Sequence, residues 1–401
     1  MAAVFAFPAL RPAPPVASRV AAVPYDVVTT DEARALAADP LSFLHVSRAE
    51  IDLPPGTSAY ADEVYARAVA NFATLRRNAP LLVDEAAGLY VYRLRMGTHV
   101  QTGVAGGFSI DDYEGGAIRK HEHTRRDKED DRTRHIVELR AQTGPVFLTY
   151  RAQPAIDAVV EQATAGAPLY DFAAADGVQH TIWLLDHEIA RSVSAAFGAL
   201  DALYIADGHH RAASAARARQ TLRASGTPTG DVFLAVAFPD GQMQVLPYNR
   251  VVKDLAGHTP QSFLEAVGRA CRVAIGPAVP RGPGDVSMFL DGRWHTVTLA
   301  PAVSRDPADR LDVSRLQQQV IQPLLRIGDL RTDTRIDFVG GARGIAELER
   351  LVTSGHAAVA FSMHPVGVDD LMAIADAGGI MPPKSTWFEP KLRDGLLSLV
   401  I

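Results

Sequence analysis

The sequence predicts an α+β protein with mixed, largely antiparallel sheets packed against helices. Two stretches lead to this prediction, because each consists of alternating strand-like runs joined by a short turn. LYVYRLRMG (89–97) and HVQTGVAGGFSI (99–110) are joined by a Gly-Thr pair, and SMFLDGRWHTVTL (287–299) contains an Asp-Gly turn. Helical and strand patterns also alternate irregularly along the chain, which favours α+β over a doubly wound parallel sheet.

In the first part of the chain, apolar residues recur at helical spacing between Ser58 and Asn78. Further strands are expected at 146–150, 181–186, 202–207, 232–238 and 243–249, and further helices at 154–165, 187–200 and 209–224. A Pro-Asp-Gly turn inside 232–249 predicts an antiparallel hairpin there.

A second part begins after Arg250, and we expect two α+β parts at 1–252 and 253–401. Thr259 is a typical N-cap followed by proline, which predicts a helix running to Cys271. The remaining helices are expected at 314–326, 344–354 and 368–377, with a strand near 357–363.

Composition excludes several classes of protein. Of 401 residues, 47% are hydrophobic and 21% are charged, and the formal net charge is −6. This charge offers no general attraction to nucleic acid or acidic membranes. A single cysteine fits a reducing compartment, and neither a signal peptide nor an apolar run of about 18 residues is apparent. We therefore expect a cytoplasmic protein with a small-molecule partner and leave its oligomeric state open.

The stretch YIADGHHRAA (204–213) gathers titratable residues where a strand pattern gives way to a helix pattern. Free backbone N–H groups and the positive end of the helix dipole favour anions at such a turn. Gly208 permits a positive φ, and Arg211 supplies a planar cation suited to phosphate or carboxylate. The turn is therefore a candidate phosphate-binding site.

Asp207 in this turn has three candidate roles: helix cap, Mg²⁺ ligand, or acceptor of a proton from a substrate hydroxyl. Alternatively, the turn has no catalytic or binding role: Asp207 only caps the helix, and the two histidines lie at the surface. His209 and His210 are adjacent and diverge, so a zinc site would need ligands from elsewhere. A phosphate site is favoured over a zinc site.

The segment 119–135, RKHEHTRRDKEDDRTRH, is either a solvated helix face or a cationic stripe. His121, Arg125, Lys128 and Arg132 follow helical spacing, and a nucleotide triphosphate would neutralise them. Glu122 is a candidate catalytic acid or base in this segment. Lys128 and Arg132 are candidate phosphate-binding residues.

The loop GGIMPPKSTWFEPKLRDGL (378–396) resembles the end of a P-loop at Lys384-Ser385. Pro383 stands where that motif needs a glycine, so a Walker A motif is rejected. The loop is either packed structure or the wall of a pocket, with Lys384 as a phosphate-binding candidate.

Five pieces of the sequence together resemble the bacterial and archaeal family called domain of unknown function 1015. They span nearly the whole chain and are VPYDVV (23–28), HEHT with Lys128 and Asp131-Arg132 downstream, IADGHHR (205–211), PYNRVV (247–252) and MPPKSTWFEPKL (381–392). The family name assigns no activity, so this resemblance implies membership and no chemistry.

DGHHR (207–211) before an alanine-rich helix also resembles the signature of ParB/sulfiredoxin-fold proteins, particularly free serine kinases. That resemblance implies a ParB/sulfiredoxin-like core, nucleotide phosphates beside the turn, and an acidic residue that activates the serine hydroxyl. Only Asp207, Gly208, His209, His210 and Arg211 carry it over. The catalytic cysteine of sulfiredoxin has no counterpart that can be placed here, since Cys271 lies far from the motif.

These observations predict a phosphotransferase acting on a small hydroxylated metabolite, with free L-serine as favoured acceptor and ATP, ADP or pyrophosphate as donor. Gly208, His210 and Arg211 would hold the donor phosphates, with Mg²⁺ near Asp207. Asp207 or Glu122 would take the hydroxyl proton, and Lys128, Arg132 and Lys384 would assist. The alternatives are a metal-dependent phosphoesterase using Asp207, His209, His210 and Glu122, and a nucleotide-binding regulator without turnover.

Overall fold

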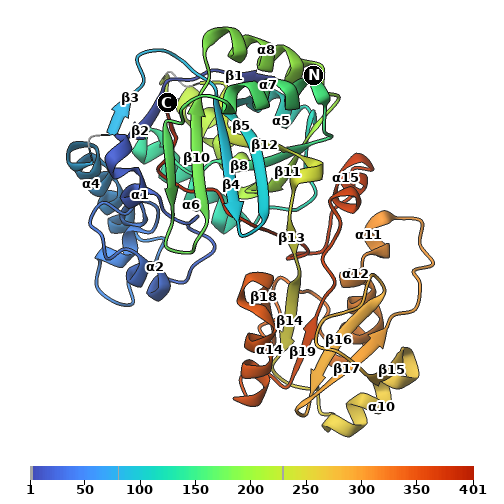
Figure 1. Ribbon diagram of the computed structural model, residues 1–401. Helices are drawn as coiled ribbons and strands as arrows, with labels where there is room; N and C mark the ends of the chain where they lie inside the picture. Colours follow the sequence, from blue (N-terminus) through green and yellow to red (C-terminus); the bar gives the residue numbers. More distant parts are fainter. Residues whose placement is uncertain (1–2, 80, 228–229) are drawn as a thin grey trace. The chain divides into compact units, whose positions relative to one another are not determined.

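The computed structural model describes residues 3–79, 81–227 and 230–401, which form two compact units (Figure 1). The first unit contains residues 1–120, 124–243 and 390–401, and the second contains 121–123 and 244–389. Division of the chain into domains near residue 252 stays a prediction. No helix in the described ranges is long and apolar enough to cross a membrane.

The main sheet of the first unit has nine strands and is largely antiparallel. The strands in spatial order are β6 (Ile118–Arg119), β11 (Leu203–Asp207), β8 (Val146–Tyr150), β12 (Val232–Pro239), β5 (His99–Ser109), β4 (Tyr90–Met96), β10 (Gln179–Leu184) and β9 (Tyr170–Ala173), with β1 (Val4–Phe5) paired to β5. Only the pairs β11–β6 and β12–β8 in this sheet are parallel. The expected α+β class is confirmed, and so is the pairing of β4 with β5.

A smaller sheet and the helices complete the first unit. The sheet contains β3 (Leu81–Val83), β2 (Ala9–Pro12), β21 (Ser398–Val400) and β7 (Ala141–Gln142). The helices are α1 (Ala17–Val20), α2 (Thr30–Leu36), α3 (Leu44–Ser47), α4 (Asp62–Asn78), α5 (Ile110–Glu114), α6 (Arg126–Leu139), α7 (Pro154–Thr164), α8 (His187–Gly198) and α9 (His209–Ala224). Helix α9 packs against β8 and β12 and against α6, and this packing holds its first turn in place.

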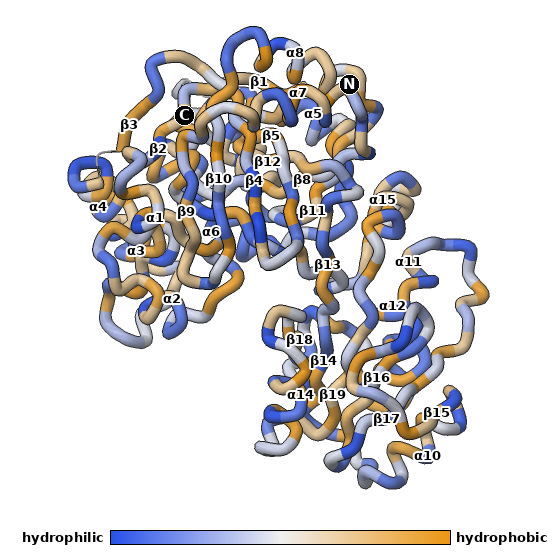
Figure 2. Tube along the Cα trace, viewed as in Figure 1, coloured by the Kyte–Doolittle hydropathy of each residue, from blue (hydrophilic) through white to orange (hydrophobic). Residues whose placement is uncertain are grey.

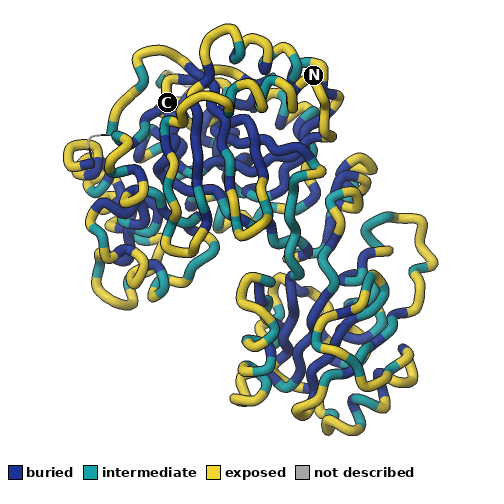
Figure 3. The backbone as a smooth tube through the Cα atoms, in the orientation of Figure 1, coloured by how far each residue is buried: buried dark blue, intermediate teal, exposed yellow. Residues whose placement is uncertain are grey.

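The core of the first unit follows the hydrophobic strands. Figure 2 shows apolar residues along β8 and β12, and Figure 3 shows β4, β5, β8 and β12 as largely buried. Phe108, Phe197 and Phe233 belong to this core and contact one another with ring centroids 6.1 and 6.4 Å apart around Phe108. Because such packing is dense, β11 and α9 have little freedom to shift.

The second unit is built on a six-stranded antiparallel sheet. Its strands in spatial order are β15 (Arg272–Ile275), β17 (Arg293–Thr298), β16 (Asp285–Leu290), β19 (Val359–Ser362), β14 (Tyr248–Val252) and β18 (Ile336–Gly340), and β13 (Val245–Leu246) pairs separately with β20 (Trp387–Phe388). Its helices are α10 (Pro260–Ala270), α11 (Pro307–Arg310), α12 (Asp312–Leu316), α13 (Gln322–Leu325), α14 (Gly344–Thr353) and α15 (Val368–Asp376). The predicted hairpin at 287–299 and the predicted cap at Thr259 are both confirmed.

Two local predictions are wrong. The stretch 232–249 is not a hairpin, because β12 pairs with β5 and β8 while β13 pairs with β20. The Asp240 carboxylate accepts hydrogen bonds from the amides of Ala152 and Gly241, so the intervening turn leads the chain away from β12. The helix expected at 314–326 is interrupted by a π-helical turn at Gln317–Ile321, just before a proline that lacks the N–H of a regular helix.

Candidate functional site

The turn between β11 and α9 is built as the sequence predicts. Strand β11 ends at Asp207, and α9 begins at His209. Gly208 is the N-cap residue with φ +96°, and a Cβ atom there would lie 2.9 Å from Nε of Arg211. Glycine is therefore required both by the left-handed backbone and by the approach of Arg211. Since Gly208 is the cap, the suggested capping role of Asp207 is wrong.

Asp207 forms ion pairs instead. Its Oδ2 lies 3.2 Å from Nζ of Lys391 and 3.6 Å from Nη2 of Arg211, and its side chain is 29% exposed. Burial alone would raise the pKa of this carboxyl, but the positive charges of Lys391 and Arg211 lower it well below its usual value. Asp207 is therefore ionised at neutral pH and holds two cations beside the turn.

Arg211 is a buried cation whose bonding is incomplete. It donates from Nη1 to the carbonyl oxygen of Pro145, and its Nη2 faces Asp207. Its Nε has no hydrogen-bond partner among the described residues. Burial would lower the pKa of the guanidinium, but Asp207 and other acids raise it, so the charge is retained. Arg211 can therefore accept an anionic ligand without leaving its present position.

Lys391 is a residue of this site that the sequence reasoning missed. It lies in the final segment 390–401, which returns to the first unit after the whole second unit. The piece MPPKSTWFEPKL contains both lysines, but the likeness of Lys384-Ser385 to a P-loop favoured Lys384. The presence of lysines at both 384 and 391 was the only sequence signal for Lys391, and their spacing did not show which of the two reaches Asp207.

The two histidines of the turn take different environments. His209 is the first residue of α9 and is 5% exposed. The ring Nε2 of His210 accepts a hydrogen bond of 2.9 Å from the backbone N–H of Arg125. The imidazole of His210 is thus oriented by the segment that precedes α6, within the first unit.

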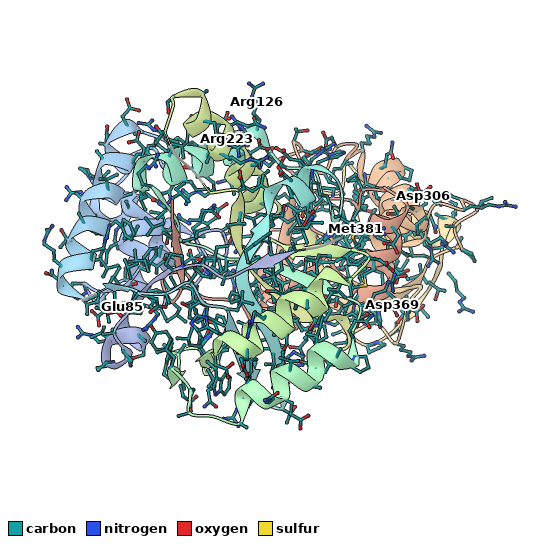
Figure 4. The ribbon with its side chains drawn as sticks, turned by 90° about the horizontal axis from the view of Figure 1, so that it is seen from above. Glu85, Arg126, Arg223, Asp306, Asp369 and Met381 are labelled. Carbon is teal, nitrogen blue, oxygen red and sulfur yellow. The ribbon has the colours of Figure 1, made fainter. Side chains whose placement is uncertain are left out.

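The predicted cationic stripe at 121–132 is wrong as a single helix face. Helix α6 begins only at Arg126, whose side chain projects from the surface in Figure 4, so His121 and Arg125 lie outside it. Arg125 has an extended backbone (φ −90°, ψ 131°), and its N–H is bound to His210. The helix starts after the residue that this hydrogen bond holds.

The remaining basic residues of the stripe are separated. Nζ of Lys128 lies 5.3 Å from the ring centroid of Tyr60. Arg132 forms an ion pair with Asp131 at 2.8 Å and stacks over Tyr25, with its guanidinium carbon 4.2 Å from the ring centroid. Arg132 thus faces inward, whereas Lys128 lies over an aromatic ring of another segment.

Arg132 and Arg211 line one cavity of about 30 Å³ within the first unit. The lining residues are Tyr25, Ser47, Arg132, His135, Ile136, Gln142, Thr143, Gly144, Val146, Arg211 and Asp394. Burial lowers the pKa of His135 to about 4, so its imidazole is neutral at physiological pH. Burial raises the pKa of Asp394 to about 7. Of the residues predicted for phosphate binding, the cavity joins Arg132 and Arg211.

Two predicted residues, Glu122 and Lys384, belong to the second unit. Lys384 adopts a left-handed backbone with φ +58°, and its Nζ lies 5.5 Å from the ring centroid of Tyr248. Participation of Glu122 and Lys384 in the site stays a prediction.

A magnesium ion fits poorly at Asp207 as the first unit stands. Mg²⁺ needs carboxylate oxygens that are not already neutralised, and it prefers several oxygen ligands in octahedral geometry. Oδ2 of Asp207 already faces Lys391 and Arg211, which would repel a divalent cation. The donor set around Asp207 therefore favours anion binding over metal binding, and Mg²⁺ stays a prediction.

Comparison with known proteins gives weak structural likenesses and one family. A free serine kinase in complex with AMP is 13% identical with a TM-score of 0.37, and the match covers 75% of this chain and 91% of that chain. SbnI with C-terminal truncation from Staphylococcus aureus is 11% identical with a TM-score of 0.39, and the match covers 74% and 87%. A conserved hypothetical protein from Pyrococcus furiosus is 13% identical with a TM-score of 0.35, and the match covers 74% and 94%.

The search of curated proteins found no match. The family model described as "Protein of unknown function (DUF1015)" matches residues 4–314. The match covers more than half of the chain and includes the charged segment, the DGHHR turn and the PYNRVV strand. The resemblance stated from the sequence is therefore confirmed, and the chain belongs to this family.

Proposed function

We propose that this protein is a phosphotransferase that moves a phosphoryl group from ATP, ADP or pyrophosphate to a small hydroxylated metabolite, with free L-serine as the favoured acceptor. The observation that carries the proposal is the Asp207 carboxylate between Lys391 and Arg211, at the first turn of α9. Phosphoryl transfer needs positioning and charge neutralisation more than covalent chemistry. Two cations held by one acid meet that requirement.

In this mechanism the acceptor oxygen forms a bond to phosphorus while the bond to the donor's leaving oxygen breaks. Lys391 and Arg211 neutralise the charge on the transferred group, assisted by the positive end of the α9 helix dipole. Asp207 orients these cations and accepts a hydrogen bond from the acceptor hydroxyl. Its low pKa makes it a weak base, so it takes the proton late, when the new ester bond has largely formed. Glu122 is the alternative base.

The choice of L-serine as acceptor rests on the resemblance of the DGHHR turn to free serine kinases. The turn alone supports phosphate binding but distinguishes poorly between acceptors. Any Mg²⁺ would be carried by the donor nucleotide and would supply charge neutralisation at its phosphates.

A donor-by-acceptor screen tests the proposal. Purified protein is incubated with ATP, ADP or pyrophosphate and with L-serine or other small alcohols, and phosphate esters are detected by ³¹P NMR. We expect one combination to give an ester and Lys391→Met to reduce its formation about 100-fold or more. The matched control is Lys253→Met, since Lys253 is an exposed lysine of the second unit that donates to a backbone carbonyl.

Three outcomes distinguish the three candidate functions. Ester formation that depends on Lys391 but not on Lys253 supports the phosphotransferase. Binding of a donor without any ester supports the nucleotide-binding regulator. Release of phosphate from esters, dependent on an added transition metal, supports the phosphoesterase.

A further inference from the structure

The cavity behind Arg211 contains polar atoms that the protein itself leaves unpaired. Among the described residues, Oγ of Ser47, Nε of Arg211 and Oδ1 of Asp394 have no hydrogen-bond partner. The three residues are only 4%, 8% and 3% exposed. Each unpaired buried polar atom costs about 1–3 kcal/mol. Three of them around one cavity indicate a site built for a polar occupant.

The charges of the walls favour an anion. Arg132 is paired with Asp131. Arg211 lies 3.6 Å from Asp207, and Asp26 and Asp394 also act on its guanidinium, so Arg211 presents a permanent cation to the cavity.

Asp394, the acidic residue in the cavity lining, opposes the binding of an anion only weakly. Burial favours the neutral form of Asp394, and its pKa is raised to about 7. The charged groups acting on Asp394 are Arg211, Asp26, Arg132 and Arg393, and Arg393 is itself paired with Asp176. A protonated Asp394 can donate a hydrogen bond to an anion instead of repelling it. His135, the other titratable group in the lining, is neutral at physiological pH.

The size of the cavity selects among anions. About 30 Å³ holds roughly two water molecules. Two oxygen atoms joined by one carbon, as in a carboxylate, match that size. The planar guanidinium of arginine also matches the planar carboxylate. Tyr25 lines the same cavity.

We propose that this cavity is a carboxylate-binding site, in which Nε of Arg211 and Oγ of Ser47 donate hydrogen bonds to the carboxylate of a small molecule. Arg211 then connects two functions, because its Nη2 faces Asp207 at the turn while its side chain also lines the cavity. The acceptor of phosphoryl transfer would thus be a hydroxy or amino acid held by its carboxylate. This last step rests on the proposed function; the binding site does not.

Binding is tested with formate as the probe, in the absence of any phosphate donor. The melting temperature is measured against sodium formate and against sodium chloride at equal ionic strength. Formamide serves as the neutral probe, since it has the same number of heavy atoms as formate. We expect a saturable rise with formate and none with formamide. A rise that chloride or formamide reproduces would overturn the proposal.

Variants locate the effect. Ser47→Val removes the hydroxyl and fills the cavity, so we expect the formate effect to disappear, while Ser192→Val on the exposed face of α8 keeps it. Should Ser47→Val fail to fold, Ser47→Ala is expected to weaken formate binding about fivefold, the value of one lost hydrogen bond. Formate binding unchanged by either Ser47 variant would place the anion elsewhere and overturn the assignment.

The two proposals fail separately. In the ester assay, L-serine is compared with L-serine amide, and we expect kcat/KM to fall about tenfold or more for the amide, which lacks the charge. Formate binding without ester formation would contradict the proposed phosphotransferase activity and support the carboxylate-binding site. Ester formation without formate binding, with equal rates for serine and its amide, would contradict the carboxylate-binding site but not the phosphotransferase activity.

Discussion

Arg211 in the first unit and Arg250 in the second are both buried, and the two are stabilised in opposite ways. Arg211 in the first unit is paired with the partly exposed Asp207. Arg250 in the second unit is fully buried and donates to the carbonyl oxygens of Tyr248 and Lys384, with its guanidinium carbon 5.5 Å from the ring centroid of Phe338. Among the described residues, no acid pairs with Arg250. Burial lowers the pKa of Arg250 to about 10, whereas acids raise that of Arg211.

The difference is the one expected between an arginine that binds an anion, as we propose for Arg211, and a structural arginine. A carboxylate partner that is partly exposed can share its cation with an incoming anion. Arg211 donates only from Nη1 to a backbone carbonyl, that of Pro145, whereas Arg250 donates from both Nη1 and Nη2 to carbonyls and so connects β14 to the loop around Lys384.

The largest expected effect comes from Asp207→Asn. It leaves Lys391 and Arg211 without their acid, so we expect stability to fall by about 3–5 kcal/mol and turnover to fall about 100-fold or more. Urea denaturation and the ester assay measure the two quantities.

The double variant Asp207→Asn/Lys391→Met removes one charge of each sign from the same place. We expect it to regain most of the lost stability but none of the turnover. Recovery of turnover in the double variant would mean that Asp207 acts only by balancing charge.

Replacing each arginine by methionine sharpens the comparison directly. Arg211→Met breaks a buried ion pair and should cost about 3 kcal/mol. Arg250→Met removes two hydrogen bonds to backbone carbonyls but also removes an uncompensated buried charge, so we expect a cost of about 1–2 kcal/mol. Chemical denaturation of both variants checks this, and equal losses would break the distinction drawn between the two arginines.

Asp394 predicts a pH dependence. Its pKa is raised to about 7 in the folded state because burial disfavours the charged form, so folding binds a proton between about pH 4 and pH 7. This contribution to stability is fully present below about pH 4 and is lost as pH rises through 7, at up to about 1.4 kcal/mol per pH unit.

Asp394→Asn should abolish that dependence. Relative to the wild type, the variant should gain stability across this window and then keep a constant difference above pH 7. Denaturation midpoints of both proteins from pH 4 to pH 8 test it, and parallel curves would contradict the shift.

The smallest expected effect is that of Arg211→Lys. The lysine keeps a positive charge but loses the planar fork, so we expect donor affinity to fall about tenfold with the fold intact. Titration of donor binding measures this change. Unaltered affinity would indicate that the guanidinium geometry is not used, and Arg211 would then resemble Arg250 in being structural.

Local chemistry made the turn and the hairpins predictable from the sequence. A glycine after an acid at the end of an apolar run indicated the turn between β11 and α9. An Asp-Gly pair indicated the turn between β16 and β17. Both depend on residues only a few positions apart. The same local reasoning failed for 232–249, because long-range pairing of β12 with β5 and β8 decided the path of the chain.

The partners of the site were not predictable in the same way. Lys391 is 184 positions from Asp207, and no periodicity connects them. Arg132 was singled out for a cationic stripe, yet it faces a cavity because Asp131 and Tyr25 hold it inward. Which of several lysines or arginines reaches an anion site is a property of packing, which a single sequence does not contain.

The path of the chain has a consequence for how the protein is made. Segment 390–401 supplies Lys391 and Asp394 and the strand β21 that joins β2 and β7, yet a ribosome synthesises it only after the whole second unit. At about 5–20 residues per second, the nascent first unit waits roughly seven to thirty seconds for these groups. During that interval Arg211 and Arg132 line an unfinished cavity. The residues of the candidate site can therefore come together only after the second unit has been synthesised.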